Sequence, residues 1–212
     1  MHSTIIFVER SAPATITAFH DILSNELISI KEKWSFEFKT FRLTVKNLLP
    51  DSTRLMHSIT LSHMENKSVI VKNKSAIVTS VAQGGLLEGL TLNGCSSGVC
   101  ESFDNLLASK LSNLWTQRQS IKGDFGSTYQ TTELVIRATN VFSYGGFKGL
   151  LIEIICEDDV SDQEFEQRVS KIRNYLKEIS IEDYKICGDF MNPQKRDFIC
   201  DLAHQYIRVL EL

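Results

Sequence analysis

The stretch KWSFEFKTFRLTVK, residues 33–46, decides the fold of this chain. Trp34, Phe36 and Phe38 occupy alternate positions in its first half. Successive side chains of a β-strand point to opposite faces, so a strand here would direct all three aromatic rings to one face. The simpler interpretation is that this face belongs to the core.

The second half of the same stretch changes the pattern. After Lys39-Thr40 the apolar positions become Phe41, Leu43 and Val45. A shift of one residue turns every side chain to the other face of a sheet, so a bulge or bend is expected near residues 39–40. Long strands of this kind are typical of a curved sheet or a barrel. If one apolar half remained outside, it would form a patch that seeks a partner.

Other apolar runs predict further strands. They cover residues 5–8, 56–64, 67–72, 75–81, 131–142 and 147–156. The links Glu65-Asn66 and Asn73-Lys74 are too short for anything but hairpins, so the strands they join are antiparallel. The loop 83–101 is rich in glycine and serine and is expected to be irregular.

Three-and-four spacing of apolar residues predicts four helices. They cover residues 13–28, 102–121, 161–179 and 192–210, and Lys122-Gly123-Asp124 would end the second. Ser11 and Ser102 could cap the first two, Ser161 and Glu164 have the spacing of a capping box, and Asn192-Pro193 would open the last. Tyr206, Ile207 and Leu210 give the last helix an apolar face, which must pack on its own sheet or on a partner.

These elements predict a single α+β domain over residues 1–212. Strands arrive in an antiparallel series with helices between groups, without regular βαβ alternation. We expect a curved antiparallel β-sheet that closes toward a barrel and is flanked by about four helices.

Composition limits the classes of function. The 212 residues are 42% hydrophobic and 23% charged, with a net charge of −3. This balance predicts a globular chain and provides no overall basic field for sequence-specific nucleic-acid binding. No apolar run approaches the roughly 20 residues that span a bilayer, and no export signal is visible, so an intracellular protein is expected. The five cysteines are best interpreted as free thiols.

One motif suggests catalysis. Gly94-Cys95-Ser96-Ser97-Gly98 matches the G-x-S-x-G pattern of serine hydrolases. In those enzymes the serine stands on a tight turn between a strand of a parallel sheet and a helix. Here the expected helix begins too late, and only His204 follows as a base. A serine hydrolase therefore stays an alternative, to be tested by labelling of Ser96 with a fluorophosphonate.

The other candidate motifs have simpler explanations. His57 and His63 could share a strand face, but no nearby ligand completes a zinc site, and Cys95 and Cys100 lack C-x-x-C spacing. Asp124-Phe125-Gly126 spells a kinase tripeptide without the rest of the kinase motifs, so it is expected to be a turn. The acidic residues from 157 to 164 suit the N-terminus of the helix that follows. We predict no catalytic, cofactor-binding or metal-binding residues and no cofactor.

Several ordered blocks of sequence resemble the fungal form of the Mediator subunit 20 family. They are Ile6-Phe7-Val8-Glu9-Arg10, Ser109-Lys110-Leu111-Ser112-Asn113-Leu114-Trp115, Gly146-Phe147-Lys148-Gly149-Leu150-Leu151-Ile152-Glu153 and Ile199-Cys200-Asp201-Leu202-Ala203. The resemblance extends from the first strand to the end of the chain.

This resemblance implies a non-catalytic subunit of the Mediator head module with a barrel-like fold. It also implies nuclear location, direct pairing with the related subunit 18, contact with other head-module subunits, and a role in RNA polymerase II initiation. An open strand edge is an attractive pairing surface, because open edges recruit strands. A stand-alone ligand-binding barrel is a further alternative and would need an open interior pocket.

Overall fold

The computed structural model describes residues 1–45, 53–64, 67–79 and 103–211. Within these ranges hydrogen bonding joins nine strands in the order β5-β4-β3-β2-β6-β7-β8-β1-β9. The strands are β1 (His2–Val8), β2 (Ser29–Leu43), β3 (Leu55–Leu61), β4 (Lys67–Lys72), β5 (Ser75–Thr79), β6 (Trp115–Gln130), β7 (Val135–Ser143), β8 (Gly146–Cys156) and β9 (Lys185–Cys187). The helices are α1 (Thr15–Leu23), α3 (Phe103–Ser109), α4 (Asp162–Glu178) and α5 (Phe198–Leu210). The expected α+β class, with a curved antiparallel sheet and four helices, is confirmed.

The chain divides into two compact units. Unit 1 contains Met1–Phe36 and Ile121–Leu212, and unit 2 contains Glu37–Ser120. Unit 1 is therefore discontinuous in sequence, and the long strands β2 and β6 each contribute residues to both units. The single domain expected from the sequence stays a prediction.

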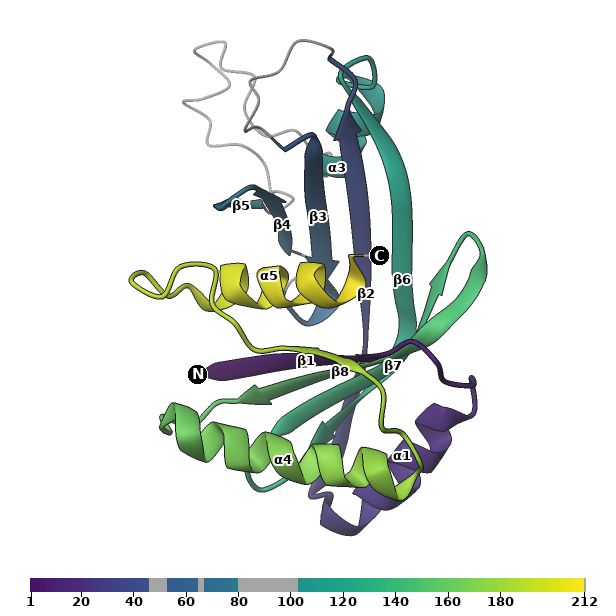
Figure 1. Ribbon diagram of the computed structural model, residues 1–212, viewed down its shortest axis with the longest axis vertical. Helices are drawn as coiled ribbons and strands as arrows, with labels where there is room; N and C mark the ends of the chain where they lie inside the picture. Colours follow the sequence, from purple (N-terminus) through teal and green to yellow (C-terminus); the bar gives the residue numbers. More distant parts are fainter. Residues whose placement is uncertain (46–52, 65–66, 80–102, 212) are drawn as a thin grey trace, which may run out of the picture. The chain divides into compact units, whose positions relative to one another are not determined.

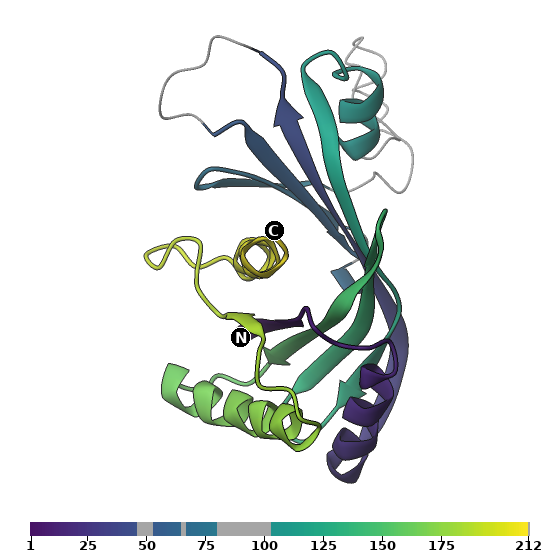
Figure 2. The same ribbon diagram turned by 45° about the vertical axis from the view of Figure 1, so that its right-hand side comes forward.

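Strand β1 is the central element of unit 1. It pairs antiparallel with β8 on one side and with β9 on the other, and all seven of its residues are buried. Its even-numbered side chains, Ile6 and Val8, belong to the core beneath α4, and the opposite side, which carries Ser3, faces α5. Figure 2 looks almost along α5 and shows it on the other side of β1 from α4.

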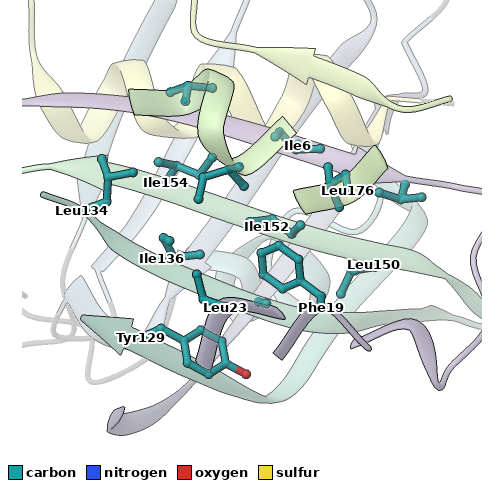
Figure 3. Close-up of a cluster of buried hydrophobic side chains, with 14 of the residues drawn as sticks. Ile6, Phe19, Leu23, Tyr129, Leu134, Ile136, Leu150, Ile152, Ile154 and Leu176 are labelled. Carbon is teal, nitrogen blue, oxygen red and sulfur yellow. The ribbon is translucent and has the colours of Figure 1, made fainter. Parts of the chain in front are cut away.

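A hydrophobic core of unit 1 lies between the sheet and the helices α1 and α4 (Figure 1). In Figure 3, side chains of the strands point toward side chains of these two helices. The strand side chains are Ile6, Ile136, Leu150, Ile152 and Ile154, and the helix side chains are Phe19, Leu23 and Leu176. Ser161 caps α4 as expected, because its hydroxyl accepts a hydrogen bond from the Glu164 N–H at 3.2 Å.

A second core belongs to unit 2 and explains the change of parity in β2. Phe41 is 1% exposed and packs with Met56, Ile70 and Leu107 of α3. Helix α3 covers the face of β2 that carries Phe41. The apolar residues of β2 therefore change to this face in the part of the strand that α3 shields from solvent. Trp34, Phe36 and Phe38, on the other parity, are also buried, which confirms their predicted core role. The bend expected near residues 39–40 stays a prediction.

The helix expected over residues 102–121 is wrong beyond its first turns. Helix α3 ends at Ser109, a turn follows at Leu111–Leu114, and Trp115 already begins β6. Gly123 lies inside this strand rather than after a helix. A Cβ atom at Gly123 would overlap the ring of Phe36, so glycine makes room for this ring against β6.

Other expected boundaries also need correction. Helix α1 is shorter than expected and runs into a 3₁₀ turn at Ser24–Glu26, and Ser11 donates to the Val8 carbonyl instead of capping it. Helix α5 begins at Phe198, where Asp197 caps it, because Asn192 forms a local turn to Gln194. A turn at Thr131–Leu134 separates β6 from β7, so residues 131–134 do not belong to the strand expected there. The strand expected over residues 56–64 ends at Leu61. Strand β9 was not expected, and loop 83–101 lies outside the described residues.

Candidate protein-interaction surfaces

The C-terminal helix is not a free binding arm. Tyr206 is fully buried, and its hydroxyl donates to Glu153 Oε2 at 2.6 Å. Arg137 Nη1 donates to the other oxygen of that carboxylate at 2.6 Å. Burial, together with the negative charge of Glu153, raises the pKa of Tyr206 well above its usual value. This buried chain of contacts fixes α5 to the strands β7 and β8.

Polar contacts also fasten α5 to β1 and to the segment before the helix. Gln205 accepts from the Ser3 hydroxyl at 2.9 Å and donates to the Ser3 carbonyl at 3.1 Å. Asp201 accepts from the Met191 N–H at 2.7 Å. The apolar face that includes Tyr206 and Leu210 is consequently part of the core, so the helix packs on its own sheet.

Unit 2 contains a buried ionic cluster between the strands and α3. Asp104 is 7% exposed and accepts from Lys39 Nζ at 3.0 Å and from the Ser58 hydroxyl at 2.6 Å. Burial lowers the pKa of Lys39, but its hydrogen bonds with Glu37 and Asp104 outweigh that effect and raise it. Lys39 pairs with both carboxylates of the cluster, so each buried charge has an opposite charge beside it, as expected of a structural network.

The catalytic alternative gains no support from the residues that can be placed. Ser96, with Cys95 and Cys100, lies outside the described residues. His204 is half-buried on α5, where burial, with the nearby Arg208, lowers its pKa. In the described ranges no three His, Cys, Asp or Glu side chains are grouped so that they could hold a metal ion.

The remaining polar motifs have structural roles. His57 is buried beside Thr40, with its ring stacked on Phe38 at 5.6 Å, so it does not reach outward as a ligand. Arg168 contacts two of the acidic residues from 157 to 164: it donates to Asp158, before α4, at 3.0 Å and to Glu164, in the first turn of α4, at 2.8 Å. No helix in the described parts of the chain is long and apolar enough to cross a membrane.

Asp124-Phe125-Gly126 forms a bulge in β6, which corrects the turn expected there. The register with β7 shifts between Gly123 and Ser127, and Phe125 has a φ of +59°. The bulge turns Phe125 outward, where it is 80% exposed. Its ring lines a groove of about 420 Å³ beside α1, together with Phe142. This is one exposed apolar surface of unit 1.

A different surface lies at the end strand β5 of unit 2. Within the described residues β5 pairs with β4 and is the last strand in the sheet order. Ile77 is 62% exposed and Val78 is 42% exposed. An edge strand of this kind is a ready template for pairing with another chain. The sequence showed the strand itself, but which strand forms an edge depends on the order of the whole sheet.

Comparison with known proteins identifies the family. The sequence model of a family described as "TATA-binding related factor (TRF) of subunit 20 of Mediator complex" matches residues 1–211. The chain belongs to the Mediator subunit 20 family. It is 57% identical over 209 residues to the Mediator subunit 20 of Eremothecium gossypii, covering 99% of both chains. It is 46% identical over 210 residues to that of Saccharomyces cerevisiae, again covering 99% of both.

Membership of the Mediator subunit 20 family agrees with the resemblance found in the sequence. These relatives are named as subunits of the Mediator of RNA polymerase II transcription. Among solved structures, one of the Schizosaccharomyces pombe Mediator head module is similar with a TM-score of 0.43 and 10% identity. That likeness covers 86% of this chain and 98% of the other.

Proposed function

We propose that this chain is a non-catalytic subunit of the Mediator head module that pairs directly with subunit 18. In that role it would act in the nucleus, beside other head-module subunits, and help couple regulators to RNA polymerase II initiation. The observation that carries the proposal is the continuous match to Mediator subunit 20 over residues 1–211. A relative that is 57% identical, without large gaps in coverage, supports a shared role for the whole chain.

The architecture is compatible with a role in assembly. The polar contacts of Tyr206, Gln205 and Asp201 are used to hold α5 in place, as expected of a scaffold. Apolar side chains remain exposed at β5 and at the bulge of β6, where partners could bind.

Purification from nuclear extract tests the proposal. We expect a tagged copy of the chain, expressed in its own organism at its natural level, to recover subunit 18 in equal amount together with other Mediator subunits. The same purification from cytosolic extract serves as the control. Recovery of the chain as a monomer, without any Mediator subunit, would contradict the proposal.

The ligand-binding barrel is the second function to be weighed. Such a protein needs an open space against the concave face of its sheet. In unit 1, Tyr206 and Leu210 of α5 are fully buried and pack on the face of the sheet opposite α4. This packing favours the scaffold over the ligand-binding barrel.

A further inference from the structure

Among the described strands, β5 pairs only with β4, and the register of that pair sets the direction of its backbone groups. The hairpin β4–β5 has a two-residue turn, Asn73-Lys74, with Lys72 paired to Ser75. Asn73 has a φ of +56°, as the first central residue of such a turn requires. In a two-residue turn the flanking residues form a hydrogen-bonded pair.

The register then assigns the direction of each peptide group in β5. Hydrogen-bonded and non-hydrogen-bonded pairs alternate along an antiparallel ladder. Ile77 pairs with Ile70 and directs its N–H and C=O toward β4, whereas Ala76 and Val78 direct theirs away from β4. Two residues of β5 therefore offer a donor and an acceptor each to whatever lies along this edge.

The side chains of β5 lack the features that protect natural sheet edges. Residues 75–79 contain no charged residue and no proline. Their neighbours across the ladder, Val69 and Ile70, are 1% and 4% exposed, but Val78 and Ile77 are 42% and 62% exposed. Long uncharged edges with exposed β-branched residues attract further strands, so natural proteins rarely leave them uncovered.

The opposite end of the sheet order behaves differently. Strand β9 has only three residues, and Lys185 in it forms an ion pair with Glu9 at 2.7 Å. A short edge strand that carries a charge is protected against added strands. Of the two end strands, β5 is the one suited to strand addition.

The charge of the hairpin β4–β5 indicates what kind of partner strand would fit beside it. The hairpin segment 67–79 contains three lysines, Lys67, Lys72 and Lys74, and no acidic residue. Lys72 lies over the ring of Trp115, whereas Lys74 is exposed in the turn that leads into β5. A partner segment that lies along β5 would pass close to the ammonium group of Lys74, and an acidic residue beside its apolar stretch would complement this charge.

We propose that β5 accepts an additional β-strand from the partner subunit, an extended segment with alternating apolar side chains and acidic residues at its flank. The inference rests on the proposed function, in which that partner is subunit 18. Backbone hydrogen bonds to Ala76 and Val78 would provide affinity, and contacts with the exposed side chains of Ile77 and Val78 would provide specificity.

Substitution of Val78 tests the added strand. Val78→Pro removes the outward N–H without removing a hydrogen bond to β4, and proline is tolerated at such an edge position. Val78→Ala removes the same side-chain bulk but keeps the N–H. We expect Val78→Pro to weaken binding of the purified full chain to subunit 18 about tenfold or more, and Val78→Ala to weaken it clearly less. Ile186→Lys on β9 serves as the control and should bind like the wild type.

Hydrogen exchange provides a second measurement that does not use a variant. The amides of Ala76 and Val78 should exchange quickly in the chain alone and slowly in its complex with subunit 18. The charge requirement is tested by Lys74→Glu, because Lys74 is exposed. This reversal should slow association and reduce its salt dependence.

The outcomes separate the inference from the proposed function. A complex that forms equally well with Val78→Pro and leaves both amides unprotected overturns the added strand, while the pairing itself stands. Slow exchange of both amides in the isolated chain also overturns it, because the chain would then cover its own edge. A wild-type chain that does not bind subunit 18 overturns the proposed pairing, and with it the partner assigned to β5.

Discussion

The hydrogen bond between Tyr206 and Glu153 should contribute measurably to the stability of unit 1. Glu153 is 0% exposed, and the Tyr206 hydroxyl donates to its Oε2 at 2.6 Å. Tyr206→Phe removes this donor and leaves the carboxylate buried. A hydrogen bond to a charged group contributes about 1.5–3 kcal/mol, so we expect the free energy of unfolding to fall by about 2 kcal/mol. For a chain of this length that corresponds to a decrease in Tm of roughly 4–8 °C.

Urea denaturation, followed by tryptophan fluorescence and by circular dichroism, measures this change. Tyr144→Phe is the matched control, because Tyr144 is 82% exposed and its substitution should change stability by less than about 0.5 kcal/mol. A Tyr206→Phe variant as stable as the control would refute the reasoning. It would mean that the other contacts of Glu153 fully compensate for the lost hydroxyl.

Four further predictions concern pH and the two units. The pKa of Tyr206 is raised, first by burial, so the stability that depends on its protonated form is complete below the unfolded pKa of about 10 and decreases as the pH rises above it. Urea titrations at pH 9 and 11 should show a smaller loss for Tyr206→Phe than for the wild type. Gly123→Ala places a methyl group against the ring of Phe36 and should cost about 1–3 kcal/mol. Gly145→Ala, whose methyl group would only reach ordinary contact distance from Lys148 Nζ, at 3.5 Å, should cost less than about 1 kcal/mol. Asp104→Ala leaves Lys39 without one of its carboxylate partners and should cost about 2–3 kcal/mol. Because β2 and β6 run through both units, calorimetry should show that Gly123→Ala and Asp104→Ala each shift one common transition; two separate transitions would show that the single-domain prediction is wrong.

The sequence predicted the elements whose signals are local. The capping spacing of Ser161 and Glu164 located the start of α4, and alternation within residues 33–38 identified β2 and its buried aromatic face. It failed over residues 110–124, where the leucines and Trp115 imitate a helix but the chain turns and enters β6. Local spacing could not show that Gly123 is needed for contact with Phe36, because that contact joins distant segments.

For the candidate surfaces too, some features could be predicted from the sequence and others could not. Sequence identified the hairpin 67–79 and the apolar face of the last helix, and its ordered blocks identified the family. The order of the strands in the sheet determines two other results. It sets which residues the buried Tyr206 of α5 contacts, and it leaves Val78 exposed on an end strand.

The amino-acid sequence alone was sufficient to predict the secondary structure of most segments and membership of the Mediator subunit 20 family. These properties follow from short-range periodicity and from residue identity along the chain. The packing of α5 on its own sheet, and the position of β5 at one end of the described strand order, became visible only in the tertiary structure. Pairing between strands far apart in sequence produces both results, and no local pattern specifies that pairing.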